Sequence, residues 1–107
     1  MNAESNRERS RMHYRVWRKK ALQIIGIACA KCGYSDSRAL QIDHVNGGGS
    51  KERKTKKLDG YKYCRFVYNE VLNGKRSKYQ ILCANCNAIK RVENNECANQ
   101  TRFDKLN

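Results

Sequence analysis

Two Cys-x-x-Cys turns constrain the fold of this chain more than any other feature of its sequence. They are Cys29-Ala-Lys-Cys32 and Cys83-Ala-Asn-Cys86. Because two thiolates on one tight turn can reach the same ion, two such turns can complete a tetrahedral sulfur site of the kind that structural Zn2+ occupies. We therefore expect one structural zinc ion on these four sulfurs. A redox-active Cys-x-x-Cys pair or a coincidence of spacing is the alternative interpretation.

The length of the chain explains why such an ion would matter. The chain has 107 residues, of which 39% are hydrophobic, and a domain of this size buries only about 65% of the surface of its unfolded chain. Zinc binding, on the order of 10 kcal/mol, would be coupled to folding and would supplement this marginal core. Among the other cysteines, we expect Cys64 to be a buried thiol and Cys97 to be a free thiol near the end of the last helix.

The formal net charge of +13 indicates a polyanionic partner, with nucleic acid as the first choice and an anionic membrane as the second. No apolar run reaches the roughly 18 residues that a membrane span needs, and residues 1–9 lack the apolar stretch of a signal peptide. We therefore expect a cytoplasmic protein. In that reducing compartment, cysteines are metal ligands more often than disulfide partners.

The spacing of apolar residues predicts a single α+β domain over residues 1–107, with residues 1–11 flexible. Helices are predicted at about 12–25, 59–73 and 85–95, strands at 39–45 and 80–82, and a mobile basic loop at 51–57. The segment 46–78 is then an insert between the first strand and the second Cys-x-x-Cys turn.

The candidate reacting centre consists of Asp43, His44 and Asn87. Asp43 and His44 end the first predicted strand before a glycine run, and Asn87 directly follows Cys86. Phosphodiester hydrolysis needs a base and a cation. The imidazole of His44 can accept a proton near neutral pH, whereas the oxygens of Asp43 and Asn87 suit Mg2+ or Mn2+.

A simpler interpretation of His44 is an ordinary polar histidine near a turn. Adjacent residues of a regular strand point to opposite faces, so Asp43 and His44 can serve one site only if the strand twists or ends there. We favour the functional interpretation because both residues lie between two cysteine turns in a strongly basic chain. His13 has no evident partner, and we expect it to be structural.

Several cations are candidates for binding the phosphates of DNA. Asn87, Lys90 and Arg91 share one face of the last predicted helix, and we expect Ala88, Ile89 and Val92 to turn inward instead. Further candidates in the first helix and the basic loop are Arg18, Lys19, Lys54, Lys56 and Lys57. Solvated basic faces are the alternative interpretation of both groups.

The ordered motifs resemble the HNH nucleases of the His-Me finger superfamily. The matching segments are Cys29-Ala-Lys-Cys32, Leu40-Gln-Ile-Asp-His-Val45 and Ile81-Leu-Cys-Ala-Asn-Cys-Asn87, and they are similar to the form in which asparagine replaces the last motif histidine. The resemblance implies a ββα-metal core with a zinc knuckle and flanking helices. It also implies that His44 is the general base, that Asp43 and Asn87 bind the catalytic ion, and that cleavage leaves 5′-phosphate and 3′-hydroxyl ends.

The chain departs from this family at two places. The insert 46–78 is longer than in the similar phage junction-resolving endonucleases, so small phage-encoded nicking and homing types are the better match. The family's middle asparagine is replaced in the segment Ser77-Lys-Tyr-Gln80. Asn69 and Asn73 are candidates to replace it, and we choose neither.

We therefore expect a metal-dependent endonuclease that cuts double-stranded DNA, including branched or nicked DNA, in the cytoplasm of a bacterial host if the chain is phage-encoded. One alternative is a non-catalytic zinc-containing module that binds nucleic acid. Another is an accessory factor that acts with a phage terminase or another packaging protein. Charge and cysteines support all three, and only Asp43, His44 and Asn87 favour the enzyme.

Overall fold

The structure is a computed structural model that describes residues 3–94, with side chains described from residue 6 onward except at Ser50. Cys97 and the end predicted for the last helix lie outside the described residues. The elements in chain order are α1 (Ala3–Ile25), a 3-10 turn (Ser37–Ala39), β1 (Leu40–His44), α2 (Gly49–Lys56), α3 (Gly60–Leu72), a second 3-10 turn (Arg76–Lys78), β2 (Tyr79–Cys83) and α4 (Ala84–Glu93).

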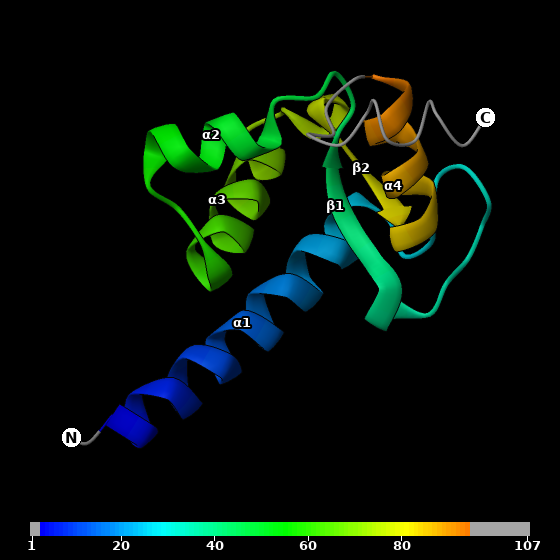
Figure 1. Ribbon diagram of the computed structural model, residues 1–107. Helices are drawn as coiled ribbons and strands as arrows, with labels where there is room; N and C mark the ends of the chain where they lie inside the picture. Colours follow the sequence, from blue (N-terminus) through cyan, green and yellow to red (C-terminus); the bar gives the residue numbers. More distant parts are fainter. Residues whose placement is uncertain (1–2, 95–107) are drawn as a thin grey trace.

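The described residues form a small α+β domain around a two-stranded antiparallel sheet, which confirms the predicted α+β class. Leu40 lies opposite Cys83 and His44 lies opposite Tyr79 in the ladder. In Figure 1, α2 and α3 lie on one side of β1 and α4 lies on the other, while the first turns of α1 extend away from the body. Two helices, α2 and α3, lie in the connection between the strands, which is the segment predicted to be an insert.

Apolar side chains from α1, α3 and both strands make one core. Val67 of α3 and Leu82 of β2 are fully buried, and Ile81 is 2% exposed. Every residue of β2 except the half-buried Gln80 is buried, because the strand has helices on both of its faces. That burial explains why the short stretch 80–82 correctly predicted a strand.

Two segments differ from the prediction. Residues 51–56 of the basic segment 51–57, expected to be a mobile loop, belong to helix α2. This helix follows Gly48 and precedes Lys57, and both of these residues have a left-handed backbone conformation. The first helix begins at Ala3 rather than near Met12, so residues 3–11, expected to be flexible, form its first turns. That stretch contains neither glycine nor proline and is rich in strong helix formers.

None of the helices in the described part of the chain combines the length and the apolar character needed to cross a membrane.

Replacing Leu82 with alanine should lower the free energy of unfolding by about 2–5 kcal/mol, because the removed side chain leaves a cavity in the centre of the core. The matched control is Leu72→Ala, since Leu72 is 60% exposed and its truncation should cost less than about 0.5 kcal/mol. Urea denaturation of both variants in zinc-containing buffer measures the difference. Equal losses would contradict the assignment of the core.

Candidate metal centre and catalytic pocket

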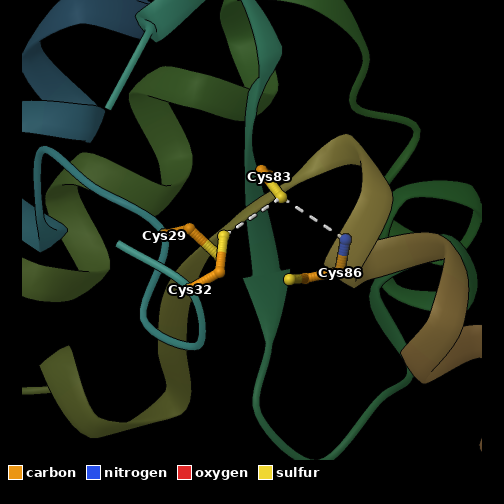
Figure 2. Close-up of side chains that lie close together, drawn as sticks. All are labelled: Cys29, Cys32, Cys83 and Cys86. Carbon is orange, nitrogen blue, oxygen red and sulfur yellow. Dashed lines mark hydrogen bonds between the residues drawn. The ribbon is translucent and has the colours of Figure 1, made fainter. Parts of the chain in front are cut away.

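The four cysteines of the two Cys-x-x-Cys turns come together in space. The sulfur atoms of Cys29, Cys32, Cys83 and Cys86 all lie within 4.8 Å of one another (Figure 2). A regular tetrahedron of Zn–S bonds of about 2.3 Å has S···S edges of about 3.8 Å, and the Sγ atoms of Cys32 and Cys83 are 3.8 Å apart. The predicted clustering is confirmed, and its dimensions fit a zinc ion.

Backbone hydrogen bonds shape the first turn and tie it to the sheet. The amide of Gly33 donates to the carbonyl of Cys29 at 2.9 Å, and Gly33 has a φ of 80°, which favours glycine. The amide of Cys29 donates to the carbonyl of Tyr34, and the amide of Ala30 donates to the carbonyl of Ile81 in β2, each at 2.8 Å. The first turn is therefore anchored to the strand that carries the second.

The second turn is the junction of β2 and α4. Cys83 ends the strand and caps the helix, because its sulfur accepts a hydrogen bond from the amide of Cys86 at 3.4 Å (Figure 2). The end of the strand and the first turn of the helix thus position both sulfurs of the second turn. This arrangement places Asn87, the next residue, in the first turn of α4.

The protonation of the cluster also suits a cation. Burial disfavours the thiolate of Cys29, but backbone amides, including that of Cys32, outweigh burial and lower its pKa to about 6. A hydrogen bond with Cys83 is the main cause that raises the pKa of Cys86 to about 12. Without a bound cation, Cys29 is therefore ionised at neutral pH whereas Cys86 retains its proton. A divalent ion on the cluster would favour ionisation of Cys86 as well.

Cys64 lies in α3 and is 5% exposed, as predicted for a buried thiol. Burial raises its pKa. It is not among the cysteines of the cluster.

Metal analysis of the purified protein should find about one zinc per chain. Cys32→Ala should lose the zinc and most of the folded far-ultraviolet circular dichroism signal, because zinc binding contributes on the order of 10 kcal/mol. Cys64→Ala should keep the zinc and cost about 1 kcal/mol in urea denaturation.

Packing alone makes the opposite prediction, because Cys32 is exposed whereas Cys64 is buried. Wild-type protein purified without zinc, or a Cys32→Ala variant that keeps its zinc, would therefore remove the zinc hypothesis. A stable, metal-free Cys32→Ala variant would contradict the contribution of zinc to folding.

The second candidate site is a cavity of about 420 Å³ at the end of β1. Asp43, His44 and Asn87 all line it, so the structure brings together the three residues of the predicted reacting centre. The glycine run Gly47–Gly49 forms part of its wall. The other lining residues are Ile42, Lys51, Arg53, Tyr63 and Arg91.

The ring of His44 is 6% exposed and is held by neighbours from two helices. Its Nε2 lies 3.0 Å from Oε1 of Glu52 in α2, and its Nδ1 lies 3.4 Å from the hydroxyl of Tyr63 in α3. A Cβ atom added at Gly49 would lie 2.8 Å from Nδ1. The third glycine of the run is therefore required so that α2 can begin against the imidazole.

Asp43 reaches this region from the α4 side. Its carboxylate accepts a hydrogen bond from Nε2 of Gln80 at 2.9 Å and forms an ion pair with Nζ of Lys90 at 3.1 Å. Lys90 also donates to the backbone carbonyl of His44 at 2.9 Å. Asp43 and His44 thus contact different helices, as the alternation of a strand requires, and both still border one cavity.

Lys90 is the clearest departure from the expected set of DNA-facing cations. It is 8% exposed and its ammonium is paired with Asp43, whereas we expected it to face a phosphate. Ala88 and Ile89, expected to turn inward, are exposed instead. The helix is rotated relative to the prediction because Cys86 must point at the thiol cluster, and Lys90, four residues on, lies on the same side.

Asn87 offers an oxygen to the cavity. Its Nδ2 donates to Oε1 of Gln41 at 2.6 Å, which fixes the orientation of the amide. Its Oδ1 is buried and accepts no hydrogen bond from the described residues. A buried carbonyl oxygen that lacks a donor fits a cation or a water molecule. Asp43 and Asn87 thus both offer oxygen atoms, the donor type that Mg2+ and Mn2+ prefer.

The remaining predicted DNA-binding residues have different surroundings. Arg91 is exposed and lines the cavity. Arg18 donates to the carbonyls of Ser37 and Leu40 at 2.5 and 2.7 Å, so it ties α1 to β1. The four other predicted residues are lysines, and all of them are exposed: Lys19 in α1 and Lys54, Lys56 and Lys57 at or just after the end of α2.

Sequence reasoning missed four residues around the reacting centre: Glu52, Tyr63, Lys78 and Gln80. Glu52 had a recognisable signal, because it is the only acidic residue in the basic segment 46–58. Gln80 lies opposite Asp43 in the ladder and occupies the segment in which the family's middle asparagine was sought. The alternatives considered for that asparagine, Asn69 and Asn73, do not line the cavity.

Glu52 connects the imidazole to two further charges. Its second oxygen lies 2.6 Å from Nζ of Lys78, which also approaches Glu70 at 3.3 Å. Burial raises the pKa of Glu52, but hydrogen bonds from Lys78 and His44 outweigh burial, so that its pKa is lowered. The carboxylate of Glu52 is therefore ionised at neutral pH beside the ring of His44.

Comparisons with known proteins found no matching family model, no matching curated protein and no matching solved structure.

Replacing Glu52 with glutamine should lower the free energy of unfolding at pH 7 by about 1–3 kcal/mol, because Lys78 and His44 lose a charged acceptor. A carboxylate whose pKa is lowered on folding stabilises the fold above its unfolded pKa of about 4.3. That contribution disappears as the pH falls through the folded value. The difference between wild type and Glu52→Gln should therefore shrink toward zero in acid.

Urea titrations at pH 7 and at acidic pH measure this difference. Glu93→Gln is the control, because Glu93 is exposed and should cost less than about 0.5 kcal/mol at either pH. A difference that stays constant with pH would contradict the role of the Glu52 charge.

Proposed function

We propose that the chain is a metal-dependent endonuclease of the HNH type that hydrolyses phosphodiester bonds of DNA. The observation that carries the proposal is the cavity shared by Asp43, His44 and Asn87. The order of β1, β2 and α4, with His44 ending the first strand and Asn87 in the helix, supports a ββα-metal core of the His-Me finger type. The cysteine cluster at the β2–α4 junction supports a structural zinc ion beside that core.

In this proposal His44 is the general base. Because ionised Glu52 lies 3.0 Å from Nε2, we assign the ring proton to Nε2, which leaves the lone pair on Nδ1. Nδ1 lies beside Gly49 and the hydroxyl of Tyr63 at the wall of the cavity. Glu52 then keeps the imidazole in the tautomer that can take a proton from water.

Asp43 and Asn87 would hold the catalytic Mg2+ or Mn2+ ion. When bound, such an ion supplies positive charge for the phosphate oxygens and the leaving oxygen. Lys90 balances the charge of Asp43 and holds the carbonyl of His44, which keeps the end of β1 in place. Lys51, Arg53 and Arg91 line the same cavity and supply cations for the flanking phosphates.

A non-catalytic zinc-containing module that binds nucleic acid is the second candidate. The ion pair between Lys90 and Asp43 favours it, because an ammonium already neutralises the acidic residue that a metal ion would need. An accessory role beside a phage terminase or another packaging protein is a variant of this candidate. In all three cases we propose DNA as the partner on the ground of the net charge of +13.

The decisive measurement is plasmid cleavage with Mg2+ or Mn2+. His44→Ala should lower the cleavage rate by about 10²–10⁴-fold, because the general base is lost. The matched control is His13→Ala, which removes the other histidine of the chain. His13 stacks against Tyr61 at a centroid distance of 5.2 Å, away from the cavity, and its loss should leave the rate unchanged.

Asp43→Asn and Asn87→Ala should also reduce cleavage and should raise the concentration of divalent ion needed for half the maximal rate. Full cleavage activity in His44→Ala would contradict the assigned mechanism. DNA binding by a folded, zinc-loaded protein that never cleaves with either ion would instead favour the binding module.

A further inference from the structure

A continuous trough leads from the candidate catalytic cavity to the far side of α1. The cavity at the end of β1 adjoins a hollow of about 470 Å³, with which it shares Ile42, Arg53, Tyr63, Asn87 and Arg91. That hollow adjoins a larger one of about 900 Å³ and shares with it Tyr14, Arg18, Leu22, Leu40 and Gln41. The trough therefore runs across β1 between α4 and α1.

The lining of this trough combines positive charge with apolar and aromatic groups. Arg15 and Lys19 line its far end together with Arg38, whose guanidinium is paired with Asp36 at 2.6 Å. Arg91 lines the end at the catalytic cavity. Among the described residues, no aspartate or glutamate lines the largest hollow. Asp59 lines the middle hollow and Asp43 lines the catalytic cavity, but arginines and lysines outnumber these carboxylates along the trough. The balance of charge favours an anionic chain.

Apolar side chains lie between these cations. Leu22, Leu40 and Ile42 form part of the walls. Tyr14 lines both the hollow of about 470 Å³ and the hollow of about 900 Å³, and it is 42% exposed. Ile27 at the far end is 71% exposed. A surface of this size and character marks a binding site more often than a solvated face.

We propose that this trough binds one single-stranded segment of DNA that continues from the scissile phosphate. The inference rests on the proposed function only for the position of that phosphate beside His44. A double helix presents phosphates and sugars at its outer surface, whereas a single strand also exposes the faces of its bases. Cations for the backbone and aromatic or apolar groups for the bases are the features of single-strand grooves.

The substrate class follows from this occupant. A duplex interrupted by a branch, a nick with a displaced end or an overhang provides a single strand next to a phosphate that can enter the cavity. An intact duplex does not provide one. The chain should therefore act on such interrupted DNA in preference to a blunt duplex of the same sequence.

Fluorescence anisotropy with a 5′-labelled oligonucleotide of about 20 nucleotides tests the binding site without added divalent ion. The wild-type protein should bind the single strand at least about tenfold more tightly than the corresponding blunt duplex. Tyr14→Ala should weaken single-strand binding about tenfold, because a stacked base loses its platform. Arg15→Gln/Lys19→Gln should reduce the slope of log K against log salt by about 1.4, or about 0.7 per phosphate contact.

The charge-matched control is Arg7→Gln/Arg9→Gln. Both residues are exposed on the same helix and neither lines the trough, so single-strand affinity and salt slope should stay close to those of the wild type. Circular dichroism and zinc content should be unchanged in all three variants. The same effect in both double variants would overturn the trough as the site and leave only net charge as the cause.

The proposal would also be overturned by tighter binding of the blunt duplex, by wild-type affinity in Tyr14→Ala, or by tighter binding of an RNA strand of the same sequence. These results differ from a failure of the proposed function. A protein that binds single strands through Tyr14 and Arg15 but cleaves nothing would retain the trough and lose the nuclease. A protein that cleaves but binds independently of the trough would do the reverse.

Discussion

Four thiols from two distant parts of the chain converge at one point of this structure. The two Cys-x-x-Cys turns are separated by about half of the chain, yet their sulfurs lie within 4.8 Å of one another. One turn follows α1, and the other joins β2 to α4. A cation that binds all four would fix the position of α4 relative to the sheet, and with it the position of Asn87. The geometry of the candidate catalytic cavity therefore depends on a site that takes no part in the proposed reaction.

The second constraint is the burial of charge around His44. The ring is 6% exposed. Ionised Glu52 contacts the ring, and ionised Lys78 contacts Glu52 in turn. Charges in such a position stabilise a fold only when they are paired, and here each has a partner. This network explains why the basic segment after the glycine run is a helix: α2 must bring Glu52 to the imidazole, and Gly49 leaves the room to do so.

Lys90 illustrates how a surface prediction fails when another residue of the helix determines which face turns inward. Helical spacing correctly placed Asn87, Lys90 and Arg91 near one another, but Cys86 determines which side of α4 turns inward. The ammonium of Lys90 consequently lies on Asp43, while Arg91 stays exposed at the cavity. Whether that ammonium assists a catalytic ion or replaces it is the main chemical difference between the nuclease and the binding module.

The sequence by itself determined the α+β class, the two strands, helices α3 and α4 and the meeting of the four cysteines. Each of these depends on local periodicity or on a ligand spacing that few structures can satisfy. It also selected Asp43, His44 and Asn87, which the structure places in one cavity. Only the tertiary structure decided that Glu52 orients His44, that Gln80 and Lys90 hold Asp43, and that a basic trough connects the cavity to α1. Those contacts join residues that are mostly distant in sequence, and no local pattern of charge or hydrophobicity records which long side chain reaches which partner.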